Sequence, residues 1–545
     1  MGGIVGIIRI HRRVGRRWIW SYLVIGSVSW PGAQLASPAA FAAEDPVVAA
    51  PAPAPLASGE PLVPSARVAG VSEPSPARGG WSFAATGAVD LSFTDNVYLT
   101  ETNRLSDFIV SPRGSFTARR STGRTLLNAN AEVAYDYYTK NTRLNGARPS
   151  ALIDGFVEVI ENTFTLDGRV ATDVQQISSE DRVPAIQRNL DRNQTQILNY
   201  GITPTLRGRF GGGVSAEAQY DYSAVNFLDP PVDPTTGAGF IQGSDTRRHT
   251  GRARIGMDEA AVAPLLWSVG GSYERSHVDS LVIRQPERGN AEGRVEYRVS
   301  APLALVARGG NDWIKEPTLL TSPDGAYGLV GVVWRPSQRT LLRADAGYRY
   351  RDFNAELDAQ YAMSRAINLS ASYRRDIQTG GRVLLDSLAG LGRDESGNLV
   401  DPISGLPPDP NSTRFGLTDQ AFKRDQFRIG VHGQVQRNFY SLAGDYEHRD
   451  ANGLGGKSWG LSAAAGRDLT PRLQASASVA YAKTTGDPGL AFGIRNSRAT
   501  SAGARLDYRM TRTMRATARY AHTRRSTTLV RYHENALILS VSNVF

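Results

Sequence analysis

Charged side chains recur at every second position in several stretches of this chain. In the clearest stretch, Glu292, Arg294, Glu296 and Arg298 alternate acid and base. Residues two apart lie on the same face of a β-strand, so each stretch would present one charged face. Across the chain, the residues that we expect to share such a face are Arg252, Arg254, Arg294, Arg298, Arg343, Asp345, Arg349, Arg505, Asp507, Arg515 and Arg519.

Two kinds of chemistry fit these residues. Opposite charges that face each other on neighbouring strands stabilise a sheet, which favours ion pairs that stiffen a wall. Arginines that line a passage select anionic solutes or acidic polysaccharide. The two interpretations are compatible, and the sequence leaves both open.

The residues between the charges are small, apolar or aromatic. Leu342, Ala344, Ala346 and Tyr348, for example, alternate with the polar positions of 343–349. A strand with one apolar and one charged face is typical of a transmembrane barrel, whose outer side meets lipid and whose inner side meets water. In lipid every backbone N–H and C=O must be paired within the protein, so such strands have to close into a barrel.

The connections between these strands alternate in length. Short turns are expected near residues 120–124, 160–163, 206–211, 259–264, 300–302, 336–338, 364–366, 436–438, 467–471 and 511–513. Longer polar stretches are expected at 175–192, 225–247, 276–289, 310–324, 376–424 and 484–497. This alternation predicts about 22 strands, within a range of about 18 to 24.

The predicted fold class is therefore all-β, a transmembrane antiparallel up-and-down β-barrel over residues 81–545. An even number of strands places both termini on the periplasmic side of a Gram-negative outer membrane. A water-soluble β-sandwich would explain neither the alternating loop lengths nor the aromatic strand ends. Tyrosines that suit the interfacial girdles of a barrel are Tyr98, Tyr135, Tyr137, Tyr220, Tyr222, Tyr348 and Tyr350.

The end of the sequence carries its own signal. Leu537, Leu539 and Val541 alternate with other residues in a final strand that closes on Phe545. A terminal Phe on an alternating strand resembles the signal that outer-membrane insertion machinery reads. We therefore expect Phe545 to act as an assembly signal, with that machinery and outer-membrane lipid as partners.

The N-terminal residues read as targeting and spacing segments. An arginine-rich start, an apolar run over 18–30 and small residues up to Ala42 predict a signal peptide over 1–42, and the run is too short for a membrane-spanning helix. Residues 43–80 are rich in Pro and Ala and predict a disordered periplasmic linker.

The net positive charge of the chain is partly due to its N-terminus. Five of the ten excess positive charges lie in the predicted signal peptide, so the net charge gives no reason to expect nucleic-acid binding. The chain has no cysteine and hence no site for an N-terminal lipid anchor.

Patterns typical of enzymes and metalloproteins are missing from the sequence. His277 and Asp279, and His448 and Asp450, are close pairs, but no serine nucleophile motif accompanies them. No zinc spacing and no glycine-rich phosphate loop occurs. We expect no catalytic residue, no metal and no cofactor.

The longest predicted loop, 376–424, is the best candidate for narrowing the lumen. A barrel of about 22 strands has a wide interior, and no segment before the predicted barrel is large enough for a folded plug domain. We expect the loop to fold inward rather than to project outward as a binding surface.

Two short motifs carry a family resemblance. Thr94-Asp95-Asn96-Val97-Tyr98 follows the first strand, and the run from Asn193 to Pro204 leads into Phe210-Gly211. With these motifs and the hairpin layout, residues 81–545 resemble the β-barrel porin 2 type of outer-membrane protein. That resemblance implies a role in exopolysaccharide biosynthesis and export, with polysaccharide and periplasmic export components as partners. The alternatives are a general or anion-selective diffusion porin and a structural or adhesive surface protein.

Overall fold

The computed structural model describes residues 9–14, 17–22, 80–176, 182–186, 188, 194–228, 244–258, 263–279, 285–389, 392–393, 399–401, 403–404, 415, 420–486, 496–528 and 530–545. The chain divides into two units, residues 1–49 and 50–545. In the first unit, β1 (Arg9–Val14) and β2 (Arg17–Tyr22) form a two-stranded antiparallel sheet. The expected cleavage region near residue 42, and all of the expected linker but its last residue, lie outside the described residues.

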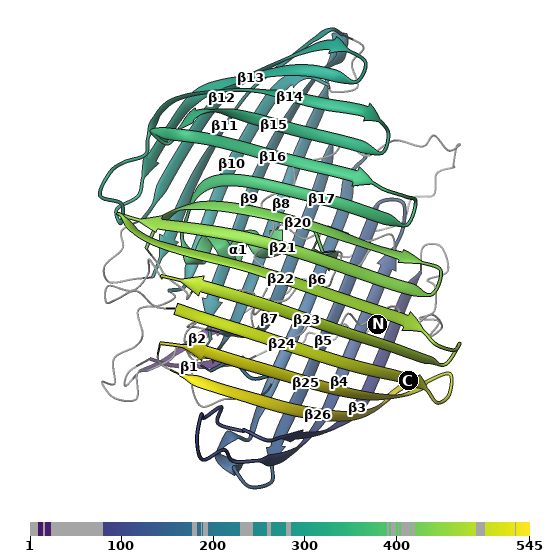
Figure 1. Cartoon of the computed structure of the whole chain (residues 1–545). Helices are drawn as coiled ribbons and strands as arrows, with labels where there is room; N and C mark the ends of the chain where they lie inside the picture. Colours follow the sequence, from purple (N-terminus) through teal and green to yellow (C-terminus); the bar gives the residue numbers. More distant parts are fainter. Residues whose placement is uncertain are drawn as a thin grey trace. The chain divides into compact units, whose positions relative to one another are not determined.

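The second unit is a closed antiparallel barrel of 22 strands, as the sequence predicts (Figure 1). Its strands are β3 (Trp81–Thr94), β4 (Asp107–Ser121), β5 (Thr125–Tyr138), β6 (Gly146–Ile160), β7 (Phe164–Gln176), β8 (Gln194–Arg209), β9 (Val214–Phe227), β10 (Thr246–Met257), β11 (Leu265–Val278), β12 (Glu287–Ser300), β13 (Leu303–Lys315), β14 (Gly325–Ser337), β15 (Thr340–Arg349), β16 (Asp352–Ala362), β17 (Ile367–Gln378), β20 (Phe422–Val435), β21 (Asn438–Ala451), β22 (Leu454–Asp468), β23 (Leu473–Thr485), β24 (Asn496–Arg509), β25 (Met514–Thr527) and β26 (Arg531–Val544). Each strand pairs with its neighbours in the sequence, and β26 pairs with β3 to close the wall.

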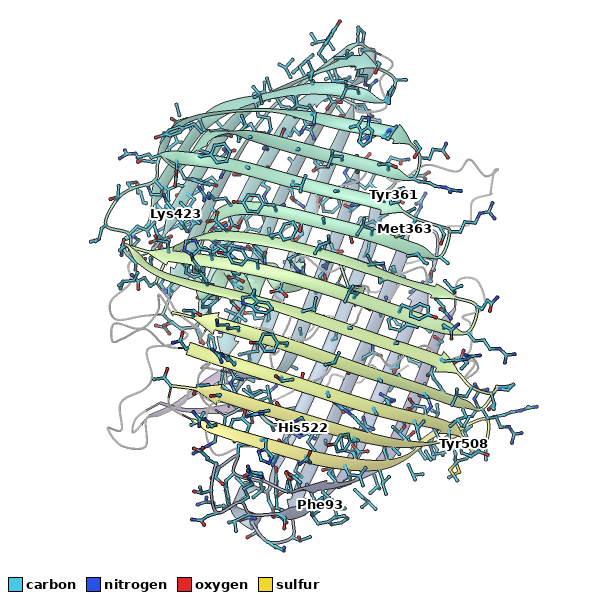
Figure 2. The ribbon with its side chains drawn as sticks, viewed as in Figure 1. Phe93, Tyr361, Met363, Lys423, Tyr508 and His522 are labelled. Carbon is cyan, nitrogen blue, oxygen red and sulfur yellow. The ribbon has the colours of Figure 1, made fainter. Side chains whose placement is uncertain are left out.

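The two faces of the wall differ as the alternation predicts. Large apolar side chains point outward and stay exposed, among them Phe93, Tyr361 and Tyr508 (Figure 2). Their strand neighbours point inward: Tyr508 is 46% exposed, whereas the adjacent Asp507 is 4% exposed. The barrel therefore carries an apolar band outside and its charge inside. Among the described residues, no helix is both long and apolar enough to cross a bilayer.

The strand ends agree with the expected short turns, of which residues 259–262 lie outside the described residues, but several long connections are shorter than predicted. The predicted loop over 310–324 overlaps β13, which runs to Lys315, and the predicted loop over 376–424 contracts to 379–421. Charged residues at these strand ends face inward and pair across strands, as Arg349 does with Asp312, so polarity there does not mark a loop. Within the last connection the structure has helix α1 (Gly380–Ala389) and a small sheet of β18 (Gly392–Arg393) and β19 (Leu399–Val400).

Two of the expected girdle tyrosines have other roles. Tyr98 packs against a buried cluster that includes Val97 and Ile109, and its hydroxyl donates to Asn141 Oδ1 over 2.7 Å. Tyr350 lies in the tight connection between β15 and β16 with a φ of 58°. Tyr135, Tyr137, Tyr220 and Tyr348 are exposed. A Tyr just beyond a strand end is thus no longer held to the outer face by the alternation.

Phe545 follows β26 directly. Its backbone N–H donates to Ala85 O over 2.8 Å, and its side chain is 79% exposed. Its expected role as an assembly signal stays a prediction.

Candidate functional site

Helix α1 lies inside the barrel. Leu384 and Leu385 pack against Ile197 of β8 and against Val225 and Phe227 of β9. On its other side, Val383 packs against Phe422 of β20 and Ala451 of β21. In the strand order, β10–β17 separate β9 from β20, so the helix joins two distant parts of the wall. A helix of 10 residues, about 15 Å long, can do so only from within the lumen.

Polar contacts fix α1 at the end of the lumen that bears the long connections. Arg248 donates to Asp386 over 2.6 Å, and Arg382 lies 3.2 Å from Glu274 of β11. Asn199 Nδ2 donates to the carbonyl oxygen of Leu384 over 2.7 Å. These bonds satisfy the charges of the helix on the inner wall, so the helix is anchored by polar as well as apolar contacts.

The pKa of Asp386 makes the docking of α1 insensitive to moderate acid. Burial would raise the pKa of this carboxyl, but attraction by Arg248 and Arg382 and hydrogen bonds from Arg248 and Gln378 outweigh it and lower the pKa from 3.8 to about 2. A depressed carboxyl pKa gives stability that is present above the unfolded value and is lost as the pH falls through the folded value. The conductance of the purified protein in a planar bilayer should therefore stay constant from about pH 8 to about pH 4. A rise in conductance already near pH 5 would contradict this role of Asp386.

The same connection reaches deeper into the lumen at residues 401, 403 and 404. Arg428 donates to Asp401 Oδ2 over 2.5 Å, and Ser441 donates to the carbonyl oxygen of Ser404 over 3.0 Å. At Gly430 of β20, a Cβ atom would lie 2.3 Å from the carbonyl oxygen of Ile403, so only glycine lets this segment approach the wall so closely. The described parts of the connection thus line the inner wall from the end of the barrel that holds α1 toward the opposite end.

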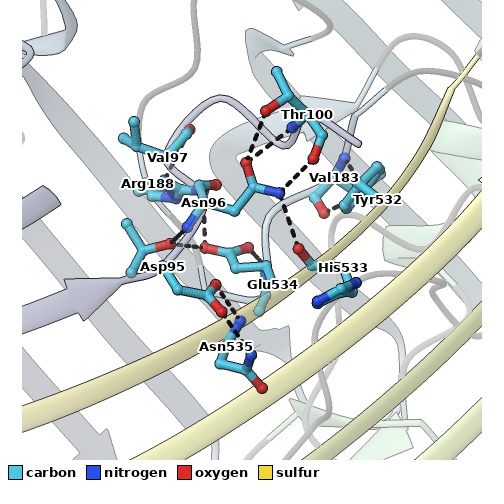
Figure 3. A network of polar contacts seen from close by, with 12 residues as sticks. Asp95, Asn96, Val97, Thr100, Val183, Arg188, Tyr532, His533, Glu534 and Asn535 are labelled. Atoms are coloured by element: carbon cyan, nitrogen blue, oxygen red, sulfur yellow. Dashed lines mark hydrogen bonds and ion pairs between the residues drawn. The ribbon is translucent and has the colours of Figure 1, made fainter. Parts of the chain in front are cut away.

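A second connection also folds inward, at residues 182–186 and 188 between β7 and β8. Figure 3 shows Arg188 against Glu534 of β26, with side-chain exposures of 1% and 0% and a separation of 2.8 Å. Glu534 also accepts hydrogen bonds from Thr94 Oγ1 and from the backbone N–H of Ala185, each over 2.6 Å. Tyr532 exchanges two hydrogen bonds with the backbone of Val183.

The Asp-Asn motif after the first strand completes this network. Asp95 accepts hydrogen bonds from the backbone N–H and from Nδ2 of Asn535, over 2.7 and 2.6 Å (Figure 3). Asn96 Nδ2 donates to the carbonyl oxygens of Thr100 and His533. The strand register between β26 and β3 ends at the pair Ala536 and Thr94. Beyond that pair, these side chains continue to join the first strand to the last.

The charged inner face of β12–β16 is a balanced network. Arg308 lies 2.7 Å from Glu356, 3.1 Å from Asp345 and 4.0 Å from Glu292. Arg349 donates to both carboxylate oxygens of Asp312, over 2.8 and 2.9 Å. Here Arg308 and Arg349 each have acids within reach, which is the arrangement that stiffens a sheet.

The structure places the predicted lumen residues in separate groups. Arg294, Arg298, Arg343, Asp345 and Arg349 belong to β12 and β15. Arg252 and Arg254 of β10 are exposed, and Arg252 donates to Gln219 over 3.3 Å. Arg505, Asp507, Arg515 and Arg519 lie on β24 and β25, which β17 and β20–β23 separate from β16 in the strand order.

Sequence reasoning missed residues of the wall network and the residues that hold the inward segments. Arg308 and Glu356 could have been found, because they share the inward parity of their strands. Helix α1 left one weak signal, since Thr379 accepts a hydrogen bond from the backbone N–H of Arg382 as a helix N-cap does. Arg188 left none, because its partner Glu534 lies far along the chain.

Across the described ranges, no group of three or more His, Asp or Glu side chains is arranged to hold a metal ion. His448 Nδ1 lies 3.4 Å from Asp425 Oδ2 at the end of β20.

No protein-family model matches the chain, and neither does any curated protein. Solved structures with a similar architecture include the siderophore receptor PirA from Acinetobacter baumannii, with 11% identity, a TM-score of 0.43 and coverage of 85% of this chain and 80% of that chain. A mutant of the ferric enterobactin receptor PfeA from Pseudomonas aeruginosa has 12% identity, a TM-score of 0.44 and coverage of 85% and 80%. The FrpB iron transporter from Neisseria meningitidis has 12% identity, a TM-score of 0.44 and coverage of 85% and 82%. Identities and TM-scores this low do not indicate a shared function. The barrel fold of this chain is shown by its own strand pairing.

Proposed function

We propose that this protein is an outer-membrane conduit for the secretion of an anionic surface polysaccharide. The observation that carries the proposal is the closed barrel whose outer face is apolar, whose inner face is rich in arginine and whose own connections occupy the lumen. A closed antiparallel barrel of this size suits the outer membrane, because each strand of the wall is paired on both sides and the outward side chains match lipid.

The inward segments favour a gated conduit. A wide, open lumen would let small solutes leak, whereas α1 narrows the mouth and is anchored by side-chain contacts that can be released. Because the anchors are ion pairs and small apolar contacts, a partner or a polymer chain that competes for the wall could displace the helix. The resemblance of residues 81–545 to the β-barrel porin 2 type supports polysaccharide as the cargo.

A diffusion porin for small anions is the second candidate. The exposure of Arg252 and Arg254 favours it, because open guanidinium groups attract small anions without help from a partner. The two candidates differ in what a cell loses when the protein is removed.

The deciding experiment is a deletion strain that is complemented with the wild-type gene. If the proposal holds, the deletion strain retains polymer in the periplasm and releases little, and complementation restores release. Normal polymer release together with slower uptake of small anions would instead support the porin. Normal release without any change in uptake would contradict both candidates.

A further inference from the structure

A row of basic side chains crosses the outer face of the barrel near the end that holds α1. It comprises Lys457, Lys483, Arg498 and Arg524, one on each of the neighbouring strands β22–β25 (Figure 1). The residue beside each of them in the sequence is buried on the inner face, so all four side chains point outward.

The strand register brings these four residues next to one another. Lys483 directly faces Arg498. Lys457 and Arg524 lie diagonally beside this pair, one on each side of it. Neighbouring strands are about 4.8 Å apart, so the row is about 14 Å wide. Like charges that face each other directly destabilise a sheet, and an anion bound between Lys483 and Arg498 would remove that repulsion.

The row lacks acidic partners. In the part of the chain that the structure describes, none of the four basic side chains takes part in a hydrogen bond or an ion pair. Strands β23 and β25 contain no acid, and the acids of β22 and β24 lie toward the opposite end. Asp450, which points outward from the adjacent strand β21, accepts a hydrogen bond from the backbone N–H of Gly453 over 2.8 Å.

Outward basic residues on other strands at the same end do have acids beside them. Glu287 of β12 lies 3.1 Å from Lys315 and 3.9 Å from Arg275. Lys423 of β20 lies 3.5 Å from Asp352. The positive charge on β22–β25 is therefore a local feature of this part of the outer face.

The neighbouring outward side chains are those of a membrane interface. Trp459 faces Lys483, and its ring centroid lies 5.1 Å from that of Tyr481. Two residues further toward the middle of the barrel, Leu461 is 52% exposed. Trp and Tyr are enriched where hydrocarbon meets the headgroups. The change from apolar to aromatic to basic side chains therefore puts the row at the level of the headgroups.

We propose that Lys457, Lys483, Arg498 and Arg524 bind the phosphate groups of a glycolipid in the outer leaflet of the outer membrane. The long connections of bacterial barrels lie on the cell-surface side, and the row lies at the end that bears them. Basic side chains attract anionic headgroups at this depth, and guanidinium and ammonium groups both bind phosphate oxygens. The inference does not rest on the proposed cargo, because the row lies outside the lumen.

The test is equilibrium binding of fluorescently labelled lipopolysaccharide to the purified full-length protein in neutral detergent. Wild-type protein is compared with Lys483→Gln/Arg498→Gln. The matched control, Arg275→Gln/Lys315→Gln, removes the same charge from the same end, beside Glu287. Heat-modifiable migration on gels confirms that each variant is a folded barrel. The first variant should lose at least about tenfold in affinity, and the control less than about threefold.

A milder variant keeps the test decisive if the double variant does not assemble. Arg524→Gln removes one exposed guanidinium and should lower the affinity by about fivefold. Unchanged binding in Arg524→Gln and in the double variant, or an equal loss in the control, would overturn the site.

Two comparison lipids identify the group that is bound. Dephosphorylated lipopolysaccharide keeps its acyl chains and should bind wild-type protein at least about tenfold more weakly than the intact form. Equal binding of the two forms would show that the row does not recognise phosphate. If phosphatidylglycerol displaces the labelled probe as well as unlabelled lipopolysaccharide does, the assignment to a glycolipid is wrong.

Discussion

Replacing residues 379–421 with a short Gly/Ser turn should raise the single-channel conductance of the protein several-fold. The replacement removes α1 and residues 401, 403 and 404, which line the lumen, and leaves the wall in place. Gln378 and Phe422 face each other at the ends of β17 and β20, so a short turn can join them without changing the register. Loop closure entropy changes by only about 0.6 kcal/mol per doubling of length, so the barrel should remain stable.

A second variant tests whether conductance is limited by the docked position of the helix or only by its presence in the chain. Leu384→Asp/Leu385→Asp keeps the connection but places charges against the apolar contacts with Ile197, Val225 and Phe227. Unpaired charge in such contacts is unfavourable, so the helix should leave the wall and the channel should fluctuate between low and high conductance. Planar-bilayer recordings measure both effects. Equal conductance in the wild type and in both variants would show that this connection does not gate the channel.

Replacing Glu534 with alanine should destabilise the barrel by about 3–5 kcal/mol, because it leaves the buried guanidinium of Arg188 without its carboxylate. The backbone N–H of Ala185 and the hydroxyl of Thr94 lose their acceptor at the same time. The effect should be concentrated at the junction between the first and last strands. Unfolding in guanidinium chloride, followed by tryptophan fluorescence, measures the loss.

Two controls test the physical cause. Glu534→Leu/Arg188→Met removes both buried charges and should be much less damaging than Glu534→Ala, since no unpaired ion is left behind. Glu161→Ala breaks the exposed pair with Arg124, whose side chains are 58% and 62% accessible, and should cost less than about 1 kcal/mol. If Glu534→Ala unfolds at the wild-type midpoint, the network in Figure 3 does not hold the junction.

The strands of the barrel wall could be predicted because the requirement on each strand can be read from a short stretch of the sequence. Each strand must show lipid an apolar face, so alternation along a short stretch reports the orientation of every residue in it. The run from Arg505 to Arg509 has the inward and outward sides that its pattern predicts, with Asp507 buried and Tyr508 exposed. The number of strands follows from the turns, which the chain marks with short polar breaks.

The contents of the lumen could not be predicted in the same way. Helix α1 is stabilised by residues from β8, β9, β10 and β11, and its own sequence is short and begins with two glycines. The Asp-Asn motif carries a family resemblance in the sequence, but its role in joining β3 to β26 depends on Asn535, far along the chain. The sequence does not fix the inward direction of the long connection, because loop residues carry no periodic pattern that shows which face they meet.

The central claim is that the barrel passes an anionic polymer, and efflux from lipid vesicles tests it most directly. Vesicles that contain the protein with residues 379–421 replaced are loaded with oligogalacturonate or with a neutral malto-oligosaccharide of the same length. The account predicts that the acidic oligomer leaves faster, because exposed arginines of the inner wall, such as Arg252 and Arg254, attract it into the lumen. Equal or slower efflux of the acidic oligomer would contradict the account.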